Sequence, residues 1–414
     1  MIRPSHQQSR FSSQTQAAVI TVVTFACLFL LSVPQPAAAQ TWTVLHSFTG
    51  TDGEEPSAGL TMDQAGNLYG TAAAGGHNNN GTVFKLTHEQ SGWIFNLLYA
   101  FNGPDGSSPQ ARVMIGPDGS LYGTTENGGA ANRGTVFRLQ PPQTFCKSFS
   151  CPWTETVLYS FQGGSSDGES PQYGDLVFDS LGNIYGTTPN GGNSWSYCSY
   201  CLGTVYKLTH TNGGWTESIV HYFQGTNDGA YPFAGLTSDG AGNWYGTAEA
   251  GGAAAAGVVY KLTPSGSGWN QSVIFDFPDY FNYDGGYPFG GLIFDSAGNL
   301  YGTTSTDGQD VGGTAYELNL NRGWAFSLIY SFSAYEGSLA KLAMDPSGNL
   351  YGTLSELNNN GEEVYKLTPS NGGWARTGFT GGSAGSAGNV ILDSDNNVYG
   401  TDFGGYGTVF EIQQ

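Results

Sequence analysis

One short motif, Tyr-Gly-Thr, recurs seven times along this 414-residue chain, at intervals of 48 to 63 residues. Each copy follows a short apolar segment, an Asp and a polar turn. The copies begin at Tyr69, Tyr122, Tyr185, Tyr245, Tyr301, Tyr351 and Tyr399. A repeat of this length that contains several short strands is typical of a β-propeller, in which each repeat forms one blade. Seven copies therefore predict seven blades.

The fourth copy shows the strands that we expect within one blade. Segments rich in apolar and aromatic residues at 235–239, 244–247, 257–263 and 269–277 alternate with turns of Gly, Ser, Asn and Pro. Aromatic and β-branched residues favour strands, and Gly and Asn accept the positive φ of tight hairpins. The sequence thus predicts an all-β, seven-bladed β-propeller with four antiparallel strands per blade.

The two ends of the repeat region predict how the ring closes. The last copy stops after its third strand, at 407–412, whereas 41–48 is a lone segment that reads as a fourth strand. We expect the N-terminal strand to complete the last blade, because that pairing removes the open sheet edges. Residues 40–414 are then a single propeller domain.

The Gly of Tyr-Gly-Thr lies inside a predicted strand, where Gly normally weakens pairing. Its recurrence in all seven copies predicts that another backbone segment or ring approaches closely there. The motif is therefore interpreted as a packing feature, and function is expected elsewhere.

Residues 1–39 read as a secretory signal peptide. Arg3 and Arg10 precede an apolar run at 17–31, and Ala37-Ala38-Ala39 supplies a small-residue end. The run is too short for a stable membrane span. We expect cleavage after Ala39 and a secreted protein, periplasmic or extracellular, with no membrane span once the signal peptide is removed.

The charge balance narrows the partner classes. The chain has 33 acidic and 13 basic residues, a net charge of −20. This argues against nucleic acid, whose phosphates need Lys and Arg, and against an anionic membrane surface. An acidic exported surface suits cations or neutral sugars, or it serves only solubility.

Four cysteines follow the predicted cleavage site: Cys146, Cys151, Cys198 and Cys201. An even number in an exported protein favours disulfides, and we expect the local pairs Cys146–Cys151 and Cys198–Cys201. A cross-link between the two adjacent repeats and a four-thiolate zinc site are the alternatives.

The repeat resembles a known family. The order Asp-x-x-Gly-Asn-x-Tyr-Gly-Thr, a Gly-Gly loop and Gly-Thr-Val-Tyr-Lys-Leu resembles the GloVer (Gloeo-Verruco) tandem repeat of exported bacterial proteins, and more distantly the blades of NHL-type propellers. The sixth copy lacks the Gly-Gly loop, and the seventh has Asn396-Asn397 in place of Gly-Asn. The resemblance implies an extracellular propeller without an assigned biochemical role, and it brings no catalytic residues.

The links between blades carry the sequence Asp-Gly-x-x-Pro in five copies. Their acids are Asp52, Asp105, Asp167, Asp228 and Asp284. Asp, Gly and Pro are turn formers, so the motif predicts a turn. The alternative is a ring of carboxylates on one face that holds Ca²⁺ or sugar hydroxyls. The sequence otherwise predicts no cofactor and no metal site.

A second position varies between copies. The residue that starts the innermost strand should line the mouth of the central channel, and across the copies it is Gly59, Arg112, Asp175, Gly235, Gly291, Lys341 and Asn389. The glycines suit a scaffold. Arg112, Asp175, Lys341 and Asn389 depart from that pattern, and polar groups that converge at a channel mouth are the default binding site of such a fold.

Two function classes remain. The first is a non-enzymatic binding or scaffolding propeller for a glycan, a peptide or a cell-surface partner, supported by aromatic-rich segments at 231–233 and 280–289. The alternative is a lyase or hydrolase that uses acidic residues and a metal on the loop face. No catalytic residue is predicted, because the sequence contains no metal-binding His cluster or convincing catalytic set.

Overall fold

The computed structural model describes residues 40–142, 152–192, 202–278, 284–306, 308, 312–333, 336–338, 340–354, 362–381 and 388–414. The predicted signal peptide and all four cysteines, Cys146, Cys151, Cys198 and Cys201, lie outside the described residues. The cleavage site and the disulfide pairing therefore stay predictions.

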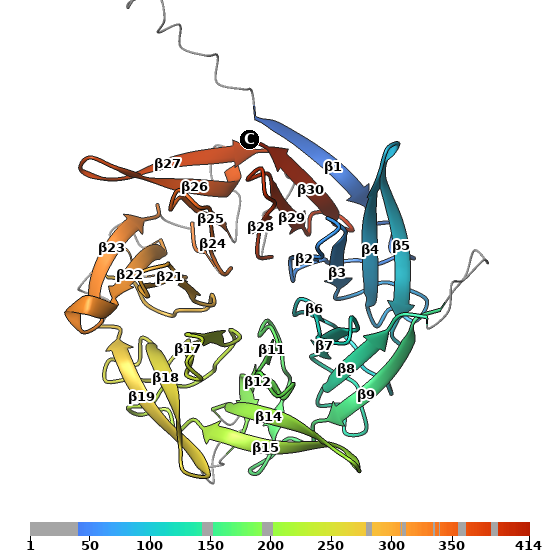
Figure 1. Cartoon of the computed structure of the whole chain (residues 1–414), viewed down its shortest axis with the longest axis horizontal. Coiled ribbons are helices and arrows are strands. Elements are labelled where there is room, and N and C mark those ends of the chain that lie inside the picture. The colour runs from blue at the N-terminus through green and yellow to red at the C-terminus, as the bar shows by residue number, and fades with distance from the viewer. Residues whose placement is uncertain are drawn as a thin grey trace, which may run out of the picture. The chain divides into compact units, whose positions relative to one another are not determined.

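Seven four-stranded antiparallel sheets form a ring within the compact unit Thr41–Gln413 (Figure 1). Blade one runs outward from the centre through β2 (Leu60–Met62), β3 (Leu68–Ala72), β4 (Thr82–Glu89) and β5 (Gly92–Ala100). Strands rich in apolar residues and short polar turns build these hairpins. The prediction of an all-β propeller with seven four-stranded blades is confirmed.

The other blades repeat this order, innermost strand first. The strands are β6 (Met114–Ile115), β7 (Leu121–Thr125), β8 (Thr135–Gln140) and β9 (Thr154–Ser160); β11 (Val177–Phe178), β12 (Ile184–Thr188), β14 (Thr204–Thr211) and β15 (Gly214–Tyr222); β16 (Thr237–Ser238), β17 (Trp244–Ala248), β18 (Val258–Ser265) and β19 (Gly268–Asp276); β20 (Ile293–Phe294), β21 (Leu300–Thr304), β22 (Thr314–Asn319) and β23 (Ala325–Ser331); and β24 (Ala343–Met344), β25 (Leu350–Thr353), β26 (Glu362–Ser370) and β27 (Gly373–Thr380). A small ribbon, β10 (Gly168–Glu169) with β13 (Asn190–Gly191), and a short 3₁₀-helix, η2 (Leu320–Arg322), complete the elements.

The last blade is closed by the N-terminal strand. It contains β28 (Ile391–Leu392), β29 (Val398–Asp402), β30 (Thr408–Gln413) and β1 (Thr41–Ser47). β1 pairs antiparallel with β30, from Thr41 opposite Gln413 to Ser47 opposite Thr408. Trp42 stacks on Phe410 with ring centroids 4.1 Å apart. The predicted closure is confirmed, and it removes the open edge that β30 would otherwise present.

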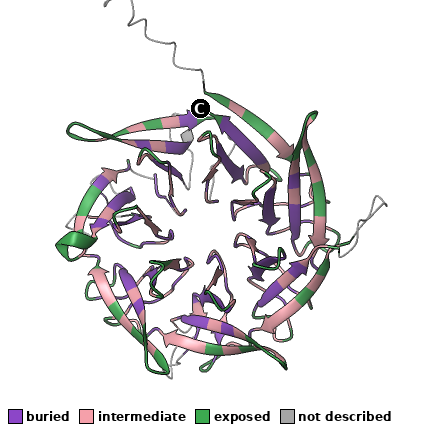
Figure 2. Ribbon diagram, viewed as in Figure 1, coloured by how far each residue is buried: buried purple, intermediate pink, exposed green. Residues whose placement is uncertain are grey.

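The hydrophobic core lies between the blades. Seven clusters of buried residues each join one blade to the next, including one that joins blade seven to blade one. The second strands are buried along their length (Figure 2). Each sheet is thus covered on both faces, which explains why its strands are apolar on both sides.

The Tyr-Gly-Thr motif holds the blades together. A Cβ on Gly302 would lie 2.4 Å from Oη of Tyr316, so no larger residue fits beside this ring. The hydroxyl of Thr303 donates to the carbonyl oxygen of Ala340 in the next blade at 3.2 Å. The other six motif glycines also face a third-strand ring. The predicted packing role of the motif is confirmed.

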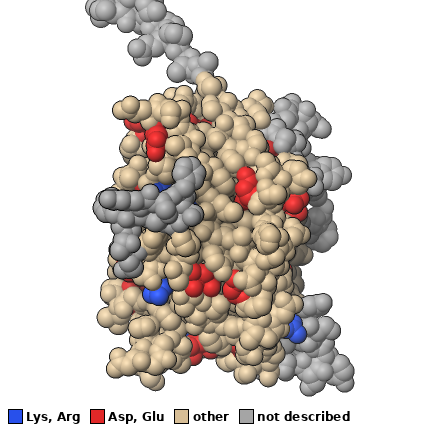
Figure 3. Space-filling view, turned by 90° about the vertical axis from the view of Figure 1, so that its right-hand side faces the viewer, with Lys and Arg blue, Asp and Glu red and all other residues tan. Residues whose placement is uncertain are grey.

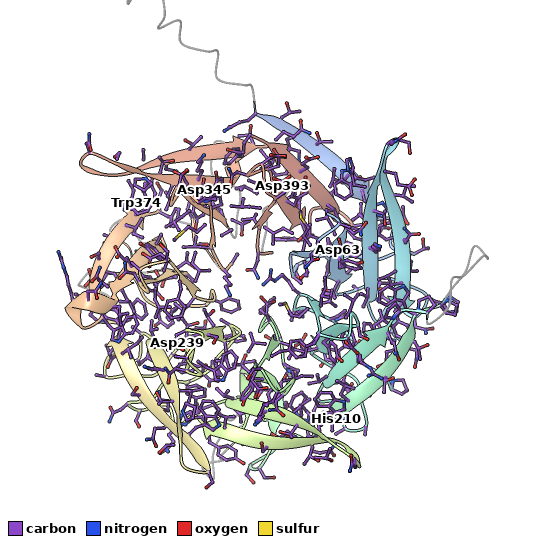
Figure 4. All side chains as sticks on the ribbon, viewed as in Figure 1. Asp63, His210, Asp239, Asp345, Trp374 and Asp393 are labelled. Atoms are coloured by element: carbon purple, nitrogen blue, oxygen red, sulfur yellow. The ribbon has the colours of Figure 1, made fainter. Side chains whose placement is uncertain are left out.

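The turn between the first two strands of each blade contains an Asp whose two carboxylate oxygens both accept hydrogen bonds. We call the side of the ring that carries these turns the hairpin face. Asp295 is representative: Oδ1 accepts from the backbone N–H groups of Ala297 and Asn299, and Oδ2 accepts from Asn299 Nδ2 and Tyr301 Oη. Burial alone would raise the pKa of Asp295, but these hydrogen bonds outweigh it and lower the pKa. Figure 4 shows four equivalent acids, Asp63, Asp239, Asp345 and Asp393, spread around the ring.

Candidate functional site

The opposite side, which we call the loop face, carries the inter-blade links and the mouth of the central channel. The residues that start the innermost strands meet there. Gly59 forms a parallel bridge with Asn389, and a Cβ on Gly235 would lie 2.5 Å from the carbonyl oxygen of Asp175. A Cβ on Gly291 would lie 3.2 Å from Lys341 Cδ. The glycines therefore leave room for larger neighbours, as expected of scaffold positions.

Arg112 and Asp175 reach each other at this mouth from blades two and three. Arg112 Nε and Nη2 both donate to Asp175 Oδ2, at 3.0 and 2.5 Å, and Nη1 donates to the carbonyl oxygen of Leu60 at 3.3 Å. The two side chains are only 15% and 10% exposed. Burial opposes the charge on Arg112, but Asp175 outweighs it and raises the pKa of the guanidinium.

The other oxygen of Asp175 is buried and has no hydrogen-bond partner within the part of the chain that the structure describes. Asp175 as a residue is 7% exposed. Buried carboxylate oxygens nearly always have a partner, since a lost hydrogen bond to a charged group costs about 1.5–3 kcal/mol. Oδ1 of Asp175 is thus available at the channel mouth to accept a hydrogen bond.

Lys341 and Asn389 complete the group from blades six and seven. The backbone N–H of Lys341 donates to Asn389 Oδ1 at 2.7 Å, and Lys341 Nζ donates to Thr237 Oγ1 at 3.2 Å. Burial lowers the pKa of Lys341 to about 8; Asp175 partly offsets this, and Arg112 adds to it. The ammonium is therefore poorly compensated for so buried a group.

Asp175, Lys341 and Asn389 line a cavity of about 70 Å³. Its walls include Gln110, Tyr173, Asp175, Phe289, Lys341 and Asn389. A second hollow, of about 310 Å³, lies against β24 and β28 and is bordered by Arg112, Lys341 and Asn389. The structure thus brings together all four of the predicted mouth residues, Arg112, Asp175, Lys341 and Asn389. They form a polar layer between two hollows.

Two cavity residues were not singled out by the sequence analysis. Gln110 Nε2 donates to Glu126 Oε2 at 2.6 Å, while Gln172 Nε2 donates to Glu126 Oε1 at 2.8 Å. Tyr173 adds an aromatic wall, 5.2 Å from Phe289 between ring centroids. The dipeptide Pro-Gln, which follows the link in copies two and three only, was the available signal.

The structure does not bring the link acids together. Asp52 accepts from the backbone N–H and the hydroxyl of Thr49 and contacts His46 Nε2 at 3.0 Å. Asp105 accepts from Tyr99 Oη at 2.5 Å and from Asn102. Asp167 and Asp228 are bound within their links in the same way, and burial raises the pKa of Asp284. Among the described residues, no three His, Cys, Asp or Glu side chains gather as a metal site.

The side of the molecule that Figure 3 shows carries few charges. Figure 3 shows scattered acids, fewer bases and a mostly uncharged surface between them. Among the described residues no helix has the length and apolar character needed to cross a membrane.

Comparison with known sequences finds one family. The Gloeobacter/Verrucomicrobia repeat matches residues 32–194 and 150–362, which together span most of the chain. No curated protein matches the sequence.

Solved structures with a similar fold include two bacterial proteins. A candidate 6-phosphogluconolactonase from Bacteroides uniformis has a TM-score of 0.52 at 16% identity and covers 80% of this chain and 86% of its own. The extracellular domain of a candidate one-component system from B. thetaiotaomicron has a TM-score of 0.54 at 10% identity. It covers 89% of this chain and 39% of its own. Identities this low relate the folds alone.

Proposed function

We propose that this chain, which belongs to the Gloeobacter/Verrucomicrobia repeat family, is an exported, non-enzymatic binding propeller that holds its ligand at the loop-face mouth of the channel. One observation carries the proposal: Asp175 is buried, paired with Arg112 through one oxygen, and left with the other oxygen unpartnered beside a cavity. A ligand that donates a hydrogen bond to Oδ1 would satisfy this carboxylate.

The surroundings of Asp175 support a binding role. The cavity combines aromatic walls with a few converging polar groups, which is the usual composition of a ligand pocket. Lys341 remains charged near neutral pH in spite of its burial. A buried ion pair and a poorly compensated ammonium are weak sources of stability, so ligand binding accounts better for their presence. The ligand is a glycan, a peptide or a cell-surface partner.

The alternative, a lyase or hydrolase, has less support. It needs several carboxylates to converge on a metal, whereas the acids of the links are engaged within their own turns. The structural neighbours include one protein named as a lactonase and one extracellular domain, so their names favour neither class.

Microarrays of oligosaccharides and of synthetic peptides, probed with the labelled protein, test the proposal. The wild type should bind a defined set of spots. Lys341→Met and the double variant Arg112→Gln/Asp175→Asn should lose these signals, whereas Leu181→Ala, at an 86% exposed site on the hairpin face, should keep them. The double variant is used because removal of Arg112 alone would strand a buried charge. Signals that survive in both mouth variants would refute the proposal.

A further inference from the structure

We infer that the ligand of this mouth is a neutral sugar, whose ring packs on an aromatic arc while its hydroxyl groups reach the polar layer. The inference rests on the proposed function and narrows it to one ligand class. Three features of the cavity carry it: the arc, two unpartnered acceptors, and the charge balance of the walls.

The aromatic arc consists of Tyr173 and Phe289, which line the cavity, and of Phe233, which stacks on Phe289. The three residues come from the links that enter blades three, four and five. Phe233 and Phe289 are stacked at 4.7 Å between ring centroids, and Tyr173 lies 5.2 Å from Phe289. All three side chains are half-buried. The cavity walls also include the polar residues Ser57 and Gln110. A ligand that fits should therefore combine an apolar face with polar groups, as a sugar ring does.

Two acceptors without partners border the same cavity. Asp175 Oδ1 is the first, and Gln110 Oε1 is the second. The orientation of the Gln110 amide is set by its network, because Nε2 donates to Glu126 Oε2. Glu126 is thus a positioning residue that leaves Oε1 as the free atom of Gln110. The cavity calls for a ligand that donates at least two hydrogen bonds.

The wall charges distinguish among ligands that donate hydrogen bonds. Of the charged groups at the cavity, Asp175 is paired with Arg112. The charge of Lys341 is matched in number by that of Glu126, which is hydrogen-bonded to Gln110. An ammonium ligand would therefore meet no unbalanced negative charge. An anionic ligand would face two unpartnered acceptors. A hydroxyl group carries no charge, donates to Asp175 and Gln110, and accepts from Lys341 Nζ. Hydroxyl-rich neutral ligands therefore match the walls best.

The cavity volume indicates how much of the ligand enters. The cavity of about 70 Å³ is much smaller than an ordinary ligand pocket of about 300–1,000 Å³, so only part of a sugar ring enters it. One edge of a sugar ring fits, with the rest of the ring lying across the arc. A terminal sugar of a longer chain could be bound in the same way, because the cavity opens to the loop face.

Calorimetric titration with methyl glycosides of glucose, galactose, mannose and xylose tests the inference, with tetramethylammonium, gluconate and tetra-alanine as comparison probes. We expect at least one glycoside to bind and the comparison probes not to. Phe289→Leu, Tyr173→Leu and Gln110→Leu should each weaken that binding about tenfold or more. Tyr406→Leu, at a 53% exposed aromatic on the same face, should leave it unchanged. Thermal melts confirm that each variant is folded.

The outcomes separate this inference from the proposed function. If tetramethylammonium, gluconate or tetra-alanine binds in place of the glycosides, and Lys341→Met abolishes that binding, the mouth is a binding site but the sugar inference is wrong. The inference is equally wrong if no glycoside binds to the wild type. If a glycoside binds with the same affinity to the wild type and to all mouth variants, both the inference and the proposed function are refuted.

Discussion

The hairpin face and the channel mouth both contain buried carboxylates, but these carboxylates differ in how many of their oxygens accept hydrogen bonds. On the hairpin face, Asp345 uses both oxygens: Oδ1 accepts from Ser347 and Asn349 N–H groups, and Oδ2 from Asn349 Nδ2 and Tyr351 Oη. At the mouth, Asp175 uses one oxygen and leaves the other without a partner. A repeated group whose oxygens are all satisfied stabilises the fold, whereas Asp175, which has an unpartnered oxygen and lines a cavity, is available to a ligand.

The lysines show the same contrast. Lys85, Lys207, Lys261 and Lys366 each lie over a motif Tyr ring in their own blade, at 5.2 to 5.4 Å. Lys341 instead donates to a single neutral hydroxyl and has a lowered pKa. A cation that is placed at so unfavourable a position reduces stability, and binding is the function that would explain its retention.

The largest expected effect concerns the repeated framework itself. Deletion of Thr41–Ser47 removes the outer strand of blade seven and the Trp42–Phe410 stack. The chain should lose much of its net stability, which is about 5–15 kcal/mol for an ordinary domain. Circular dichroism melts measure this loss. An unchanged melting temperature would show that β1 does not close the ring.

A second variant tests the hairpin face alone. Asp345→Ala removes the acceptor of four hydrogen bonds at a residue that is 6% exposed. We expect a loss of about 2–4 kcal/mol in unfolding free energy, measured by urea titration, with ligand affinity unchanged. Asp395→Ala, an exposed acid in the equivalent turn of blade seven, is the matched control and should change stability little. A selective loss of binding in folded Asp345→Ala protein would undo the comparison.

A third variant should increase the stability of the protein instead of lowering it. Lys341→Met removes a buried ammonium, so the protein should gain about 2 kcal/mol of stability near neutral pH while losing ligand binding. Between a pH of about 8 and the ordinary lysine value of 10.5, the unfolded chain holds a proton that the folded chain has released. Wild-type stability attributable to Lys341 therefore rises with pH across this window, and the variant should lack that rise. Urea titrations at both ends of the window measure it, and a destabilised variant would contradict the interpretation.

The smallest effect concerns two half-buried acids between blades. Burial, with added repulsion from Asp105 and Asp167 respectively, raises the pKa of Glu155 and of Glu217 to about 7. The folded chain then holds protons that the unfolded chain has released between a pH of about 4.5 and 7. Stability attributable to these groups should fall as pH rises through that range. Melts of Glu155→Gln/Glu217→Gln should show a weaker pH dependence than the wild type, and an equal dependence would refute the assignment.

Much of the fold could be predicted from sequence, because the same pattern of strand and turn residues recurs seven times. The recurring glycine, Gly302 and its equivalents, predicted the close approach of a ring. The lone strand at 41–48 predicted how the ring of blades closes. The mouth position could be located, since Arg112 and Lys341 break a pattern of small residues. The pairing of Arg112 with Asp175 could not be predicted, because it depends on how far side chains reach across the channel. The Gln110–Glu126 contact likewise depends on loop geometry that no local pattern encodes.

The most direct test of the account compares affinity and stability in two variants of buried acids. For the methyl glycoside that binds best, calorimetric affinity and urea unfolding are measured for Arg112→Gln/Asp175→Asn and for Asp345→Ala. The mouth variant should be folded and lose binding, whereas the hairpin variant should lose stability but retain the wild-type affinity. Retained affinity in the folded mouth variant would contradict the claim that the channel mouth holds the ligand.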